Sequence, residues 1–241
     1  MPHQPNSSGS TSTDGRIPEA ELCLQLTLAP FVAAEFNRHL GYPAAAAPAE
    51  RMNDRIARIV AEAHAALQPR GSFAIYPVAD QTAHSLTLGQ TAISGAIGDY
   101  LAHARRVAVF VVTLGEEISR RAEAAAKSGD AFSAWVIDAF GSWAAEATAD
   151  ALMLCLGEHL GEGEALTLRY SPGYCGMEIA QQRALFSLVQ AGPLGVTLMP
   201  SMLMHPLKSI SGLVGLAPRA SVADHRSPCE LCPRFGCSMR R

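Results

Sequence analysis

Apolar residues follow a helical period most clearly over residues 52–67. There they recur three and four residues apart, which places them on one face of an amphipathic helix that Pro69 ends. The same pattern predicts further helices over residues 19–40, 93–101, 116–125, 131–160 and 177–190. In the last two of these helices we expect Trp135 and Ile179 to face the core.

Short apolar runs between the helices have the length and residue types of strands. The most apolar of them, Arg106 to Leu114, is rich in β-branched residues and is expected to be a central strand. Five more strands are predicted, over residues 72–76, 85–88, 165–170, 196–204 and 209–216. Because strands and helices do not alternate regularly, the pattern favours an α+β fold over a doubly wound sheet.

Composition excludes several classes of protein. The chain has 241 residues, of which 49% are hydrophobic and 17% charged, so it can bury a full core and is not globally disordered. Its net charge of −3 gives no reason to expect nucleic acid as a partner. No apolar run reaches the roughly 18 residues of a membrane helix, so no membrane association is expected.

We therefore expect one domain over residues 19–218, flanked at each end of the chain by a segment of different composition. Residues 1–18 are rich in Ser, Thr, Gly and Pro and have no apolar core of a secretory signal, which indicates a disordered tail. Residues 219–241 form a polar, cysteine-rich segment. Six cysteines in a chain of this length are not a disulfide scaffold, so a cytoplasmic protein with reduced thiols is the simplest interpretation.

Candidate chemistry is concentrated in the segment Arg169 to Tyr174, which reads Arg-Tyr-Ser-Pro-Gly-Tyr. The chain has no phosphate-binding loop, no nucleophile elbow and no zinc-protease motif elsewhere. An arginine at the end of a strand can hold a carboxylate with two parallel hydrogen bonds, and the glycine lets a ligand approach the turn closely. Taken alone, an arginine before a Pro-Gly turn is more often structural than functional.

The surrounding sequence resembles the activation domain of vitamin B12-dependent methionine synthase, in a free-standing version. Arg169 to Tyr174 looks like the RxxxGY motif of that family. Four further segments are similar to parts of the same domain and follow in the same order within residues 30–217: Thr113–Glu116, Asp138–Ser142, Ala145–Asp150 and Lys208–Gly212.

The resemblance implies a curved, mixed or antiparallel sheet with flanking helices that binds S-adenosylmethionine. In the family, the bound sulfonium methylates cobalamin after an electron from flavodoxin or ferredoxin has reduced cob(II)alamin. By this resemblance Arg169 holds the ligand's carboxylate, Tyr170 and Gly173 offer backbone contacts, and Tyr174 lies against the ligand. Glu146 is the candidate partner of the ligand's amino group and Asp150 a weaker one, although both acids could equally be solvated helix residues.

The sequence departs from the family in two respects. An acidic residue in the family's amino-terminal part also contacts the ligand, and we identify no counterpart of it in the sequence. The chain also lacks a cobalamin-binding Asp-x-His-x-x-Gly segment. We therefore expect the domain to serve a separate cobalamin-binding corrinoid protein or methionine synthase core. The domain itself is not expected to contain a catalytic acid, base or nucleophile.

A second candidate site is the cluster Cys229, Cys232 and Cys237. Three thiolates so close together suggest a metal, either zinc, with His225 as a fourth ligand, or an iron–sulfur cluster with one open iron. A flexible tail with reduced cysteines, or a redox-labile disulfide, explains the pattern equally well. The alternative function is therefore that of a metal- or iron–sulfur-binding redox accessory protein that acts through this cysteine cluster.

Overall fold

A computed structural model describes residues 20–23, 25–43, 46–174, 176–223, 230 and 232. Its strands are β1 (Ala20–Cys23), β2 (Arg70–Thr82), β3 (Ser85–Leu88), β4 (Thr91–Ser94), β5 (Arg106–Thr113), β6 (Glu164–Leu166), β7 (Thr197–Leu198), β8 (Met204–His205) and β9 (Ser209–Pro218). Its helices are α1 (Ala33–His39), α2 (Glu50–His64), α3 (Ile97–Tyr100), α4 (Glu117–Lys127), α5 (Ala131–Gly157), α6 (Gln182–Leu188) and α7 (Arg219–Ala223), with short 3₁₀ turns η1 (Ile179–Gln181) and η2 (Gly192–Leu194).

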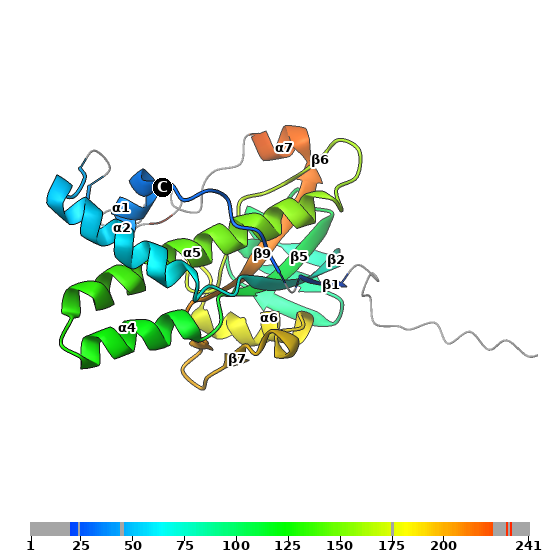
Figure 1. The fold of residues 1–241 in the computed structure, drawn as a ribbon. Coiled ribbons are helices and arrows are strands. Elements are labelled where there is room, and N and C mark those ends of the chain that lie inside the picture. The colour runs from blue at the N-terminus through cyan, green and yellow to red at the C-terminus, as the bar shows by residue number, and fades with distance from the viewer. Residues whose placement is uncertain are drawn as a thin grey trace, which may run out of the picture.

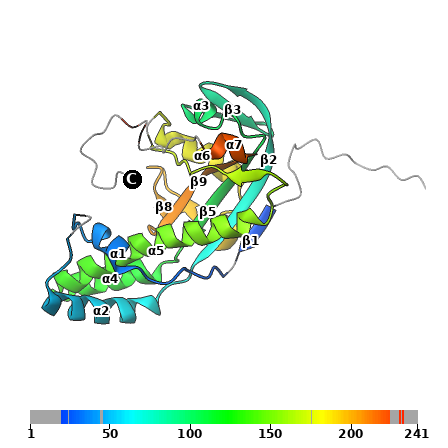
Figure 2. The ribbon, with the colours of Figure 1, turned by 90° about the horizontal axis from the view of Figure 1, so that it is seen from above.

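The main sheet is antiparallel in all of its described pairs and has the order β4-β3-β2-β5-β9-β6, with β1 paired to the first half of β2. The long strand β2 pairs with β5 over residues 70–77 and with β3 over residues 78–82, with an irregularity between Val78 and Asp80. Such an irregularity bends a strand and increases its twist. The sheet accordingly curls into a half-barrel, which Figure 2 shows from above. The predicted α+β class with a curved sheet is confirmed.

Strand β5 is buried on both faces, as expected of a central strand. Val107, Val109 and Val111 belong to the core beneath α3, α6 and η2. The alternate residues Ala108, Phe110 and Val112 belong to the core beneath α5. Because neighbouring side chains of a strand point to opposite faces, one strand supplies both cores.

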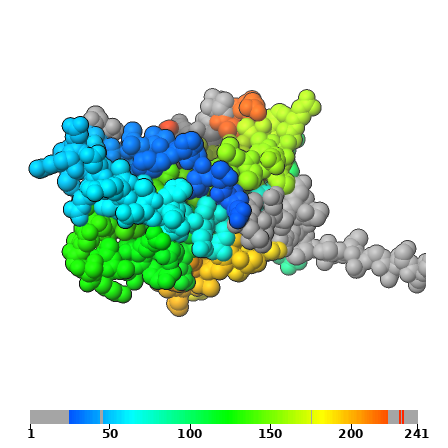
Figure 3. All heavy atoms as spheres, viewed as in Figure 1, coloured from blue at the N-terminus to red at the C-terminus, as the bar shows by residue number. Residues whose placement is uncertain are grey.

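Helix α5 is apolar around most of its circumference because it is covered on two sides. Ala149, Leu152 and Leu156 pack on the sheet. Phe140 and Ala144 pack against α1, α2 and α4. Figure 1 shows α5 crossing the sheet, and Figure 3 shows α1 and α2 covering much of it from outside. Among the described residues no helix is long and apolar enough to cross a membrane.

Two of the predicted helices are wrong in part, because strand pairing overrides local propensity. Within 19–40, residues 20–23 form β1 and pair with β2, and only Ala33–His39 is helical. Within 93–101, Ile93 lies in β4 opposite Leu86, and the helix is reduced to α3. The predicted strand 196–204 is also wrong over most of its length, since only Thr197–Leu198 and Met204 pair.

Two residues that were expected in the core lie at the surface. Trp135 is 41% exposed and contacts the ring of Phe132 instead, with 5.7 Å between the ring centroids. Ile179 is 45% exposed because its segment forms the 3₁₀ turn η1 ahead of α6. A helical period does not show which stripe of a largely apolar helix meets the core.

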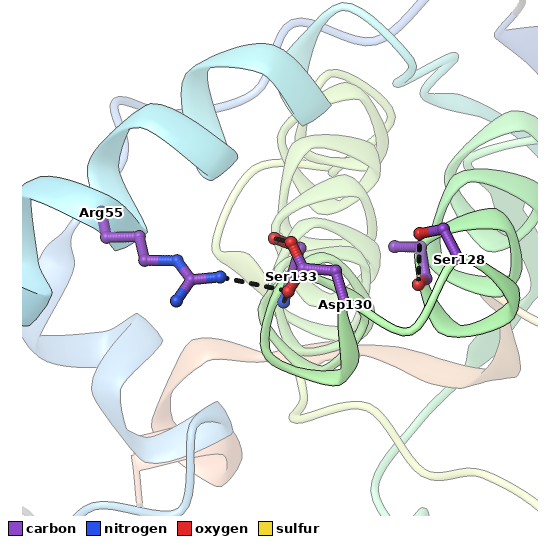
Figure 4. Close-up of polar contacts among 5 residues, drawn as sticks. Arg55, Ser128, Asp130 and Ser133 are labelled. Atoms are coloured by element: carbon purple, nitrogen blue, oxygen red, sulfur yellow. Dashed lines mark hydrogen bonds and ion pairs between the residues drawn. The ribbon is translucent and has the colours of Figure 1, made fainter.

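Asp130 fixes the start of α5, as Figure 4 shows. Its carboxylate accepts hydrogen bonds from the hydroxyl of Ser133 at 2.7 Å and from the backbone N–H of Ser133 at 3.0 Å, and Arg55 of α2 lies at 3.1 Å. The hydrogen bonds from the side chain and then the backbone of Ser133 lower the pKa of Asp130 most, burial opposes them less strongly, and the charge of Arg55 adds a smaller lowering. The cap therefore stabilises the folded state most when it is ionised.

We predict that Asp130→Ala lowers Tm by a few degrees at pH 7, measured by calorimetry. Because the folded pKa lies below the unfolded value of about 3.9, the contribution is present above that pH and is lost as the pH falls through the folded pKa. The Tm difference between the variant and the wild type should therefore shrink below about pH 4. Asp54→Ala, at an exposed position of α2, is the matched control and should leave Tm unchanged. Equal losses in both variants would contradict the assignment of the cap.

Candidate functional site

The position of Arg169 follows from the pairing of its neighbour Tyr170 with strand β9. Tyr170 donates its N–H to the carbonyl oxygen of Leu213 at 2.9 Å and accepts the N–H of Leu213 at 2.8 Å. The Tyr170 ring is 1% exposed and belongs to the core on the α6 side of the sheet. Since side chains alternate along extended backbone, Arg169 is directed toward the α5 face.

Two carboxylates of α5 hold the guanidinium of Arg169. Its Nη2 lies 3.0 Å from Oε2 of Glu146 and 3.0 Å from Oδ1 of Asp150. The two acids are four residues apart and therefore share one face of the helix. The structure thus brings together Arg169 and Glu146, both predicted from sequence, and adds Asp150, the weaker candidate.

One end of this guanidinium is unused. The Arg169 side chain is only 15% exposed, and its Nη1 is buried without a hydrogen-bond partner in the described structure. An unsatisfied buried donor of a charged group costs free energy, and such groups are rare in native proteins. A ligand oxygen brought to Nη1 would remove this cost.

The turn after Arg169 is closed by its own hydrogen bonds. Gly173, at a φ of +90°, donates its N–H to the carbonyl oxygen of Met177 at 2.9 Å, and Tyr174 donates to Ser171 at 3.1 Å. The N–H groups of Tyr170 and Gly173 are therefore engaged, and a ligand cannot take them without opening the turn. Tyr174 is 47% exposed, so its ring is accessible from solvent, and its contact with a ligand stays a prediction.

A cavity of about 270 Å³ lies between α1 and α5 and includes both acids that hold Arg169. Helix α1 contributes Glu35, Arg38 and His39 to its wall, and α5 contributes Trp143 and Ala147 beside Glu146 and Asp150. The sequence did not predict that residues of α1 line this cavity, because that depends on where α1 packs on α5. The i, i+3, i+4 spacing of the three polar residues is the one signal that marks a shared helix face.

A family model described as "Vitamin B12 dependent methionine synthase, activation domain" matches residues 45–223. The chain belongs to this family. The resemblance stated from the sequence is thereby confirmed. A comparison with curated proteins finds no match.

The fold of this activation domain is similar to that of a solved relative. A crystal structure described as the MetH reactivation domain bound to AdoHcy matches with a TM-score of 0.57 and 17% sequence identity. The match covers 82% of this chain and 80% of that chain. At this identity the comparison shows the fold alone.

Two of the segments on which the resemblance was based meet in space. Lys208, which precedes β9, places its Nζ 2.7 Å from Oδ1 of Asp138 and 2.9 Å from the hydroxyl of Ser142. The Lys208 stem passes Gly141, where a Cβ would lie 3.1 Å from Cε of the lysine. These contacts tie α5 to β9, the strand that carries the partner of Tyr170.

The predicted metal cluster is largely outside the described part of the chain. Cys229 and Cys237 are not described, and Cys232 is half-buried. Within the described residues no group of three or more His, Cys, Asp or Glu side chains could hold a metal ion. Metal binding by the three cysteines therefore stays a prediction.

We predict that chain purified anaerobically contains close to one equivalent of zinc, or of an iron–sulfur cluster, and that Cys229→Ser loses it. Elemental analysis and the visible absorption spectrum distinguish the two metals. Cys155→Ser is the control, since this half-buried cysteine belongs to α5. Metal-free wild-type protein would contradict the prediction.

A substitution at Gly212 of β9 tests the antiparallel bridge between Tyr170 and Leu213, which directs Arg169. A Cβ at this position would lie 2.9 Å from the Tyr170 carbonyl oxygen and 3.0 Å from the Phe110 ring. We predict that Gly212→Ala lowers the free energy of unfolding by about 1–3 kcal/mol in denaturant, since neither the backbone carbonyl nor the buried ring can move away easily. Gly157→Ala is the control because nothing lies within 4 Å of its Cβ position. Equal stability of the two variants would mean that the bridge tolerates displacement.

Proposed function

We propose that this activation domain binds S-adenosylmethionine with the amino-acid end of the ligand at Arg169. In this role it supports reductive methylation of cob(II)alamin held by a separate corrinoid protein or methionine synthase core. Membership of the family and a fold similar to a domain described as bound to AdoHcy support the proposal. The observation that carries it is the buried Arg169 guanidinium, which is fixed by two carboxylates and has an unused Nη1.

The charges around the cavity match those of the proposed ligand. S-Adenosylmethionine carries a carboxylate, an ammonium group and a sulfonium. Arg169 offers a donor for the carboxylate. Glu146 and Asp150 offer acceptors for the ammonium group, and the side chains that hold the arginine therefore also bind the opposite charge of the ligand. Glu35 of α1 adds an acid on the same cavity wall, in the amino-terminal part of the domain where the sequence showed no acidic ligand contact.

Methyl transfer from S-adenosylmethionine requires this chain only to bind and orient the ligand. The sulfonium supplies the methyl group that is transferred, and this transfer needs no general base. The side chains of the site accordingly include fixed charges and an exposed aromatic ring. What they can do is hold the amino-acid end at Arg169 and limit the rotation of the ligand, which raises the fraction of productive encounters.

The surroundings of the site suit a protein partner. Leu168, Tyr174 and Ile179 are large apolar side chains that are about half exposed, and they lie in the segment around Arg169. Exposed apolar side chains near a ligand site are typical of a surface that a partner covers. We propose a cobalamin-binding protein as this partner, flavodoxin or ferredoxin as the electron donor, and the cytoplasm as the location.

We predict saturable binding of S-adenosylmethionine in a calorimetric titration, and binding at least about 100-fold weaker for Arg169→Ala, since truncating one partner of a desolvated ion pair costs about 3 kcal/mol. Arg169→Lys keeps the charge but loses the planar pair of donors, so it should bind with intermediate affinity. Arg105→Ala, at an exposed arginine, is the matched control.

Two results would contradict the proposal. Unchanged affinity in Arg169→Ala would place the ligand elsewhere. Absence of binding in the wild type would mean that the fold persists without the activity. Because Arg169→Ala removes the guanidinium that Glu146 and Asp150 both contact, thermal unfolding of each variant must accompany the titration.

A further inference from the structure

A second arginine lies in an unusual environment at the opposite face of the sheet. Arg70 is the first residue of β2, and alternation along that strand places it on the same face as Ala74 and Tyr76, beneath α6 and η2. Its side chain is half-buried, and its Nε is buried without a hydrogen-bond partner. The structure gives its guanidinium no hydrogen bond or ion pair with any described residue.

An unpaired arginine is costly in such a position. A charge removed from water is normally paired or hydrogen-bonded, since the loss of hydration is otherwise not compensated. Arg106, at the far end of the β2–β5 pair, illustrates the usual state, since it lies 2.6 Å from Oε2 of Glu164 and donates to the His159 carbonyl oxygen at 3.0 Å. Arg70 therefore has a buried Nε that lacks the hydrogen-bond partner such donors normally have, and its charge has no acid beside it among the described residues.

Arg70 lines a cavity of about 620 Å³. The wall is formed by the end of the sheet around Gln68 and Arg70, the start of α4 from Gly115 to Arg120, and the loop Gly192 to Gly195. The cavity is distinct from the one between α1 and α5, which contains the acids that hold Arg169. It is larger than a bare inorganic anion requires, so there is room for the body of a small molecule.

The other charged side chains of this wall already have partners. Glu117 pairs with Arg120 and lies 3.0 Å from Nε of Arg121. Glu116 lies 3.0 Å from Nε2 of His205. Both acids thus have partners other than Arg70, which is the charged group of the cavity wall left without a partner in the described structure.

The start of α4 adds a second favourable feature for an anion. The amino end of a helix carries partial positive charge and unpaired N–H groups, and the cap residue Glu116 makes no side-chain hydrogen bond to them. Gly115 precedes it at a φ of +76°, and a Cβ there would lie 3.5 Å from Nη2 of Arg70. The absence of a side chain at Gly115 keeps the space beside the guanidinium open.

We propose that this cavity is a binding site for a small organic oxyanion, either a carboxylate or a phosphate monoester, whose charged group lies against Arg70. The planar guanidinium presents parallel donors that match both kinds of oxyanion. The remaining volume holds the uncharged part of the ligand between α4 and the loop Gly192 to Gly195. This site is distinct from the proposed S-adenosylmethionine site, since the two cavities share no lining residue.

The test is a titration of the ¹⁵N-labelled chain with malonate and with glycerol 3-phosphate at constant ionic strength, followed by amide shifts of Gly115 and Gly195. We expect saturable shifts with at least one probe, and at least a tenfold weaker affinity in Arg70→Gln. A response to malonate alone identifies a carboxylate site, and a response to glycerol 3-phosphate alone identifies a phosphate site. Arg105→Gln is the matched control and should titrate as the wild type does.

Two outcomes would overturn the proposal: no saturable shift with either probe, or equal affinity in Arg70→Gln and the wild type. Because Arg70 has no partner to lose, Arg70→Gln should remain folded, with a Tm within about 2 °C of the wild type. Should it fail to fold, Arg70→Lys answers the same question, since it keeps the charge and loses the paired donors. Lysine should then weaken probe binding several-fold, and unchanged binding would again overturn the proposal.

Discussion

The antiparallel bridge between Tyr170 and Leu213 is the constraint on which the candidate site depends. This bridge holds the Tyr170 ring in the core on one face of the sheet, so the side chain of Arg169 points to the other face. A shift of one residue in this register would exchange the two side chains. Gly212 makes the register possible, because its missing side chain leaves room for the Tyr170 carbonyl and the Phe110 ring.

Helix α5 supplies the two carboxylates that hold Arg169. Its buried length lies between the sheet and the layer of α1, α2 and α4, so the face with Glu146 and Asp150 has little freedom to rotate. Asp130 fixes one end of the helix and Lys208 ties its middle to the sheet. In the proposed function, charges fixed in this way receive the amino-acid end of the ligand without first having to be ordered. Helix α5 therefore contributes to the site by holding these two acids in place beside Arg169.

The sequence was most informative where chemistry is local. Arg169 and Glu146, which the sequence offered separately as candidate ligand contacts, lie 3.0 Å apart, and β3 and β5 were predicted nearly to their ends. The environment of a side chain could not be predicted where it depends on how helices and strands pack together. The cavity residues of α1, the exposed side of Trp135 and the isolation of Arg70 all depend on which elements meet, and residue spacing does not encode that.

The most direct test is a crystal structure of the chain in complex with AdoHcy. Our account predicts that the ligand's carboxylate lies within hydrogen-bond distance of the Arg169 guanidinium, with the amino group near Glu146 and Asp150 and the Tyr174 ring against the ligand. A ligand bound with its amino-acid end away from Arg169, or in a different cavity, would contradict the central claim that the bridge to Leu213 places Arg169 for this purpose.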